Sequence, residues 1–150
     1  MKTTEIQELL TYISTKKYPT EIENALRKLT HKTHQDNDNN IHLDIADFKT
    51  ILDDKEKILF GTAKSKENTS ITNVLELAIE DATLNKDTLS SISGILMYFK
   101  INPDFPLMEI SEGMNLIYEY ADEDADIVWS TITDESMNLS SIEVSMFLVS

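Results

Sequence analysis

The chain has 150 residues, a formal net charge of −14 at pH 7 and no cysteine. A chain of this length fits one domain with a sizeable core, and that core cannot depend on disulfide bonds. The negative charge disfavours binding to nucleic acid or to an anionic membrane, so a protein is the expected partner. With no apolar run long enough to span a membrane and no signal peptide at the N-terminus, we predict a cytoplasmic protein.

Apolar residues near the N-terminus follow helical spacing in two stretches, separated by Tyr18-Pro19. This pattern predicts a helical hairpin. A polar run of Asn and Asp follows from His34, and such residues favour turns because their side chains bond to their own backbone. Residues 1–35 also carry six Lys or Arg against four Glu, whereas the rest of the chain is strongly acidic. We therefore predict an N-terminal hairpin extension over 1–35, followed by a domain over 36–150.

Two carboxylates, Asp44 and Asp47, lie where an apolar strip enters a helix that should begin near residue 45. Judged by spacing alone, they would cap this helix, because carboxylates accept hydrogen bonds from free amides at its positive end. The pattern then alternates between strands and helices. Strands are expected at 57–64, 92–101, 126–133 and 142–149, and the longer helices at 70–82 and 107–121. This order predicts an α+β fold in two layers.

The segment from His42 to Phe48 resembles the synergy loop of the bacterial tubulin homologue FtsZ, whose motif is Asn-Leu-Asp-Phe-Ala-Asp-Val. Gly94-Ile-Leu-Met is similar to a Gly-Val-Leu strand of that family. Asn102-Pro-Asp-Phe-Pro-Leu-Met-Glu-Ile resembles its Gly-Gly-Pro-Asp-Leu-x-Leu-x-Glu turn. The resemblance covers about residues 41–150 and implies the C-terminal domain of FtsZ, with a four-stranded mixed sheet packed on helices.

In that family the loop projects onto the GTP of the next subunit in a filament, and its acids orient the attacking water. The resemblance therefore implies that His42, Asp44 and Asp47 face the nucleotide of a partner. FtsZ binds GTP through a separate N-terminal domain with a Gly-rich loop, whereas the only glycines here, Gly61, Gly94 and Gly113, are scattered. We expect no enzymatic activity and no cofactor for the chain alone, and at most acids contributed to a partner's GTPase site.

The favoured function is that of a stand-alone FtsZ C-terminal-domain-like protein. It would bind or modulate FtsZ filaments in cell division through the synergy-loop face, with full-length FtsZ as the partner. One alternative is a contribution in trans to GTP hydrolysis by FtsZ. Another is a diverged interaction domain that has no FtsZ role and associates with itself through the hairpin.

Two polar clusters deserve comparison with metal sites. The histidines at 31, 34 and 42 have nearby aspartates but neither a cysteine nor a fixed turn to hold them around zinc. The acidic run from Asp122 to Asp126 begins like a calcium loop, but Ile127 takes the place of the required glycine and Thr133 that of the closing glutamate. We predict no metal site.

Overall fold

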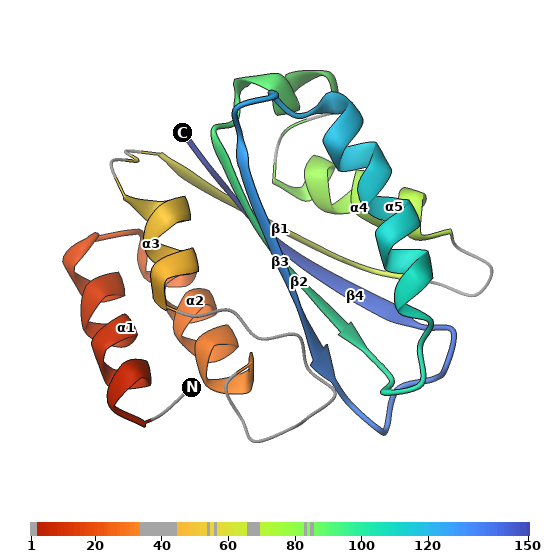
Figure 1. Ribbon diagram of the computed structural model, residues 1–150, viewed down its shortest axis with the longest axis horizontal. Helices are drawn as coiled ribbons and strands as arrows, with labels where there is room; N and C mark the ends of the chain where they lie inside the picture. The colour runs from red at the N-terminus through yellow and green to blue at the C-terminus, as the bar shows by residue number, and fades with distance from the viewer. Residues whose placement is uncertain are drawn as a thin grey trace.

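The computed structural model describes residues 3–33, 45–53, 55, 57–65, 70–82, 84 and 86–150 (Figure 1). Its α-helices are α1 (Thr3–Thr15), α2 (Thr20–Thr33), α3 (Ile45–Leu52), α4 (Ile71–Asp81) and α5 (Leu107–Tyr120). A short 3-10 helix, η1, spans Lys86–Ser91. The strands are β1 (Ile58–Lys64), β2 (Gly94–Ile101), β3 (Asp126–Thr133) and β4 (Ile142–Val149).

The strands form one mixed sheet with the order β1-β4-β2-β3. β4 lies inside the sheet and pairs antiparallel with both β1 and β2, whereas β3 runs parallel to β2. The ladder between β1 and β4 continues beyond the strands, since Lys57 and Ser150 exchange two backbone hydrogen bonds of 3.1 Å. One end of the sheet therefore holds the starts of β1, β2 and β3 and the end of β4.

Helices cover both faces of the sheet (Figure 1). α4 and α5 pack on one face over a core that includes Ile95, Met97 and Phe99 of β2. On the other face, α1, α2 and α3 enclose a second core that includes Leu96 and Tyr98 of the same strand. Because successive side chains of a strand point to opposite faces, β2 is apolar at nearly every position. The strand is therefore buried on both faces.

The predicted α+β fold with a four-stranded mixed sheet is confirmed, and α4 and α5 form its expected helical layer. The N-terminal hairpin forms as predicted, and together with α3 it adds a helical layer on the opposite face. Leu9, Ile13 and Leu26 of the hairpin are fully buried. The division into 1–35 and 36–150 stays a prediction, which the shared core makes testable.

Close contacts fix α4 on β1. Ser70 caps α4, because its hydroxyl oxygen accepts a hydrogen bond from the backbone N–H of Asn73. At the other end of α4, the Asp81 carboxylate accepts from the backbone N–H of Thr62 at 2.9 Å. Gly61 lets the two elements approach, since a Cβ there would lie 2.0 Å from the carbonyl oxygen of Ala78. The helix therefore lies directly on the strand backbone.

Within the described residues, none of the helices has the length and apolar character needed to cross a membrane.

Candidate functional site

The predicted synergy-loop segment enters the described structure at Ile45, the first residue of α3. His42 and Asp44 lie outside the described residues, so of the three predicted site residues the structure describes Asp47 alone. Asp47 lies in the first turn of α3 and is partly exposed. A carboxylate there is favoured by the partial positive charge at the start of the helix. This position suits both helix capping and presentation to a partner.

The apolar side of α3 holds this turn on the sheet. Phe48, Ile51 and Leu52 are fully buried in the second core, and the Phe48 ring lies 6.5 Å from the ring of Tyr98. The last turn of α3 lies at the start of β2, because the carbonyl oxygen of Ile51 would be 3.3 Å from a Cβ at Gly94. The first turn of α3 therefore points toward the end where β2 and β3 finish (Figure 1).

Helix α1 braces α3 from the side. The Lys49 ammonium lies 5.6 Å from the centre of the Tyr12 ring, within the range of a cation–π interaction. The Tyr12 hydroxyl donates a hydrogen bond to the Asp53 carboxylate. These contacts link the hairpin to the last turn of α3 and to the residue that follows it. These contacts could not be predicted from the sequence, because no local spacing rule connects residue 12 with residues 49 and 53.

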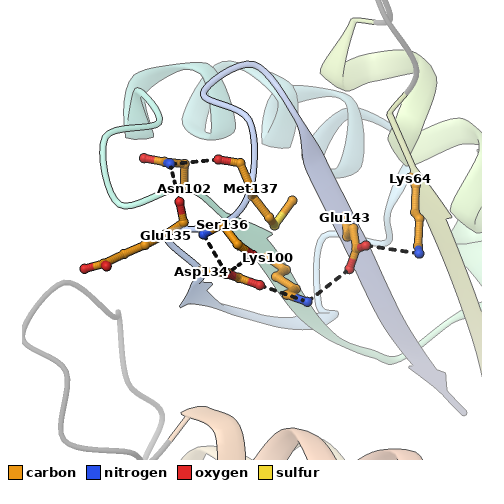
Figure 2. A network of polar contacts seen from close by, with 8 residues as sticks. All are labelled: Lys64, Lys100, Asn102, Asp134, Glu135, Ser136, Met137 and Glu143. Atoms are coloured by element: carbon orange, nitrogen blue, oxygen red, sulfur yellow. Dashed lines mark hydrogen bonds and ion pairs between the residues drawn. The ribbon is translucent and has the colours of Figure 1, made fainter.

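A polar network fixes the β3–β4 connection at the end of the sheet where β2 and β3 finish (Figure 2). The Lys100 ammonium lies 3.4 Å from the Asp134 carboxylate and 3.9 Å from that of Glu143, which also pairs with Lys64 at 3.2 Å. The Ser136 hydroxyl donates to Asp134 at 2.6 Å, and this bond is the main cause that lowers the pKa of the Asp134 carboxyl. The network thereby stabilises the charged form of Asp134.

The same connection is held from the end of β2. The side-chain amide of Asn102 donates to the backbone carbonyl of Met137 at 2.8 Å and to that of Glu135 at 3.5 Å (Figure 2). Asn102 opens the segment that resembles the Gly-Gly-Pro-Asp-Leu-x-Leu-x-Glu turn. Its role in the described structure is to join the β2–α5 turn to the β3–β4 connection.

Metal coordination finds no support in the described part of the chain, where no group of three or more His, Cys, Asp or Glu side chains could hold an ion. The acidic run at 122–126 forms the turn from α5 to β3, in which the Asp124 amide donates to the Asp122 carboxylate at 2.8 Å. The histidines at 31, 34 and 42, which were compared with a zinc site, lie outside the side chains that the structure describes.

The glycines have packing roles. Gly61 lies in β1, Gly94 begins β2 and Gly113 lies in α5. A Cβ at any of them would come within 3 Å of a neighbouring atom. All the glycines of the sequence therefore lie where neighbouring helices or strands approach closely.

A family model described as the C-terminal domain of the FtsZ family matches residues 55–149. The cell division protein FtsZ of Helicobacter pylori strain J99 is 26% identical over 107 residues, which are 71% of this chain and 28% of that protein. FtsZ of Pseudomonas aeruginosa is 30% identical over 97 residues, which are 65% of this chain and 25% of that protein. The chain thus spans about a quarter of the length of these relatives.

Solved structures share the fold over a longer stretch. An empty FtsZ dimer from M. jannaschii matches 89% of this chain and 40% of its own, with a TM-score of 0.68 and 19% identity. A protofilament of Bacillus thuringiensis serovar israelensis TubZ matches 95% of this chain and 39% of its own, with a TM-score of 0.60 and 9% identity. Residues 36–150 make up 115 of the 150 residues, so both matches extend into the hairpin.

Proposed function

Because the chain belongs to the FtsZ family through its C-terminal domain, we propose that it binds FtsZ filaments in cell division and modulates their assembly. The contact would be made by the face that carries His42, Asp44 and Asp47. The observation that carries this proposal is the synergy-loop-like motif running into α3, whose first turn holds Asp47 at the surface. FtsZ itself is the partner of matching chemistry, since a domain of this family can meet the same subunit face that its relatives meet.

The packing of α3 suits a docking role. Its buried side chains anchor it to the sheet and Tyr12 braces it from α1, so the Asp47 carboxylate is presented from a supported helix. Such support lowers the entropy lost when a partner binds. The carboxylates carry the same sign of charge as a nucleotide phosphate. They would therefore act near GTP by orienting water or by accepting hydrogen bonds from the partner.

Co-sedimentation with full-length FtsZ tests the proposal, with GTP turnover measured in parallel. We expect the chain to reduce the sedimented FtsZ at substoichiometric amounts, because a cap acts at filament ends. Asp47→Ala and the double variant Asp44→Ala/Asp47→Ala should weaken the effect. Asp124→Ala is the control, since it removes an exposed carboxylate from the opposite end of the sheet. It should behave like the unmodified chain.

GTP turnover separates capping from catalysis in trans. If the chain only caps, both it and the double variant lower the turnover. If the acids complete the partner's site, an excess of the unmodified chain raises the turnover of assembly-impaired FtsZ, and the double variant does not. Failure of both versions to change sedimentation or turnover at severalfold excess would refute either role.

Self-association through the hairpin is the remaining alternative. Its buried side chains Leu9, Ile13 and Leu26 already pack against the sheet of the same chain. The large exposed apolar side chains among the described residues lie elsewhere, on α4, α5 and the connection before β4. Sedimentation velocity over a range of concentrations should therefore show a monomer, and a tight dimer would favour the diverged-domain alternative instead.

A further inference from the structure

An open cleft of about 750 Å³ lies between the α1–α2 turn and the end of the sheet where β1 begins and β4 ends. Lysines line it from two separate segments. Lys16 and Lys17 come from the turn, and Lys55 and Lys57 come from the segment before β1. Apolar side chains, Leu59, Ile92 and Leu148, also line the cleft. Its size falls within the range of ligand sites.

The positive charge of this cleft contrasts with the rest of the molecule. Four of the 13 Lys and Arg residues line it, in a chain whose net charge is −14. Among the residues that the structure describes, Arg27, Lys64 and Lys100 form ion pairs, whereas the cleft lysines form none. The carbonyl end of α1 at Thr15 lies next to Lys16 and Lys17 and partly stabilises them. The cleft therefore offers several cations to a ligand.

The backbone of Lys17 is unusual. Its φ of 54° lies in the left-handed region, where glycine or asparagine is the common residue after a helix. A lysine in this conformation is less stable than a glycine would be. Strained residues of this kind are concentrated at functional sites. A glycine would relieve the strain at position 17 but would remove the positive charge, so the charge is the property that lysine adds there.

We propose that this lysine-lined cleft binds an acidic peptide segment of a partner protein. Its carboxylates would pair with the lysines, and an apolar side chain would contact Pro19, Ile58 and Leu59, the more exposed apolar residues of the lining. The apolar part of the lining favours a peptide over a free phosphate, because a phosphate ion has no apolar group that could pack against it.

This site is separate from the proposed filament-binding face. The cleft lies at the end of the sheet where β1 and β2 begin, whereas the first turn of α3 points toward the end where β2 finishes. Strands of seven or eight residues place the two ends roughly 25 Å apart. Either site can therefore fail its test while the other passes.

The probe is a fluorescein-labelled synthetic peptide of about ten residues in which Glu alternates with Leu and Phe, and its binding is followed by anisotropy. We expect a Kd in the micromolar range that weakens severalfold as salt rises, because exposed ion pairs are screened. Peptides with Gln in place of Glu, or with Ser in place of Leu and Phe, should bind much more weakly. Equal binding of the Gln peptide would overturn the proposal, as would equal competition by pyrophosphate or by anionic phosphatidylglycerol vesicles.

Matched variants locate the site on the chain. Lys55→Gln/Lys57→Gln should weaken binding about tenfold, which corresponds to about 1.4 kcal/mol. Lys64→Gln/Lys100→Gln removes the same charge at the other end of the sheet and should leave the affinity within about twofold of the starting value. Lys17→Gly should weaken peptide binding and at the same time raise the thermal midpoint of unfolding. A variant that was merely destabilised would bind more weakly and also unfold at a lower temperature. Equal loss in both double variants would overturn the assignment.

Acidic neighbours in the sequence give a check in the opposite direction. Asp54 and Glu56 alternate with Lys55 and Lys57 along the chain. Asp54→Asn/Glu56→Gln removes negative charge next to two of the lysines and should strengthen binding of the acidic peptide. Weaker binding by this variant would contradict a site that works by charge.

Discussion

Gly61→Ala tests how closely α4 lies on β1. A Cβ at Gly61 would be 2.0 Å from the carbonyl oxygen of Ala78 and 2.9 Å from the backbone nitrogen of Ala82. Both atoms belong to the backbone at the end of α4, so no side-chain rotation can relieve the overlap. The helix must retreat until the contact reaches the ordinary 3.4–4 Å. That movement also strains the 2.9 Å hydrogen bond from Thr62 to Asp81.

The expected loss of stability follows from these two effects. Overpacking in a well-filled core costs about 1–3 kcal/mol. Loss of a hydrogen bond to a charged group costs about 1.5–3 kcal/mol when it breaks completely. We expect Gly61→Ala to lower the free energy of unfolding by about 3 kcal/mol, which for a chain of this size lowers Tm by about 6–12 °C. The variant should remain folded, because small domains have about 5–15 kcal/mol of stability.

Gly113→Ala is the control, because the same substitution there meets a side chain. Its Cβ would contact Ile71 side-chain atoms at 2.8–3.2 Å, and Ile71 is only partly buried and can shift. Alanine also favours a helix over glycine by about 1 kcal/mol, which offsets the crowding. Urea unfolding followed by circular dichroism should place Gly113→Ala within about 1 kcal/mol of the unmodified chain. A Gly61→Ala variant of equal stability would refute the close packing of α4 on β1.

Burial, helped by the charge of Asp53, raises the pKa of the Tyr18 phenol from 10.0 to about 12. Because the pKa of Tyr18 is higher in the folded chain than in the unfolded chain, the contribution of the neutral phenol to stability is complete below pH 10. It is lost as the pH rises from 10 to 12. An ultraviolet titration of the phenol, combined with unfolding measurements over this pH range, will measure the loss. Tyr18→Phe should abolish that loss and stabilise the fold by about 1 kcal/mol, since the buried hydroxyl has no partner among the described residues. Ser136→Ala should raise the pKa of Asp134 toward its ordinary value, which a carboxyl NMR titration will measure. In the unmodified chain, the lowered pKa of Asp134 contributes stability at neutral pH, and this contribution is lost as the pH falls through the pKa of the folded state. Deletion of residues 1–35 should expose the second core and abolish cooperative unfolding. The reason is that each fully buried Leu or Ile removed with the hairpin contributes about 1.5–3 kcal/mol. Unchanged stability of residues 36–150 would instead support a folding boundary at the predicted position.

The strands could be predicted from the sequence because their apolar pattern and the turns between them agree. β3 and β4 have the predicted bounds, and β1 and β2 begin one and two residues later than predicted. The alternation of apolar residues in β4 places Ile142, Val144 and Met146 on one face, and that face is buried in the first core. The same alternation does not predict that Phe147 and Val149 are buried in the second core. A strand pattern shows that a face is apolar, but it cannot show which helix covers the other face.

The role of the hairpin illustrates that limit. Its helical spacing and the break before Pro19 predicted two helices, and both are present. Their position on the sheet depends on contacts between distant residues, such as Tyr12 with Asp53, for which the sequence carries no local signal. The solved FtsZ and TubZ structures match 89% and 95% of this chain, which is more than residues 36–150 make up. Part of the hairpin therefore belongs to the shared fold, although its sequence gave no resemblance.

The candidate sites differ in how they could be found. The synergy-loop-like face was identified by a resemblance in consecutive residues, and its role stays a prediction because two of its three members lie outside the described residues. The lysine cleft could not be found this way, since Lys17 and Lys55 are far apart in the sequence and meet only when the hairpin packs on the sheet. If Lys55→Gln/Lys57→Gln weakens the acidic peptide but leaves FtsZ sedimentation unchanged, and Asp47→Ala does the reverse, the two ends of the sheet act independently. If either variant alters both measurements, the hairpin couples them. Tyr12, which contacts Lys49 of α3 and Asp53 directly after it, is the first residue to test for that coupling.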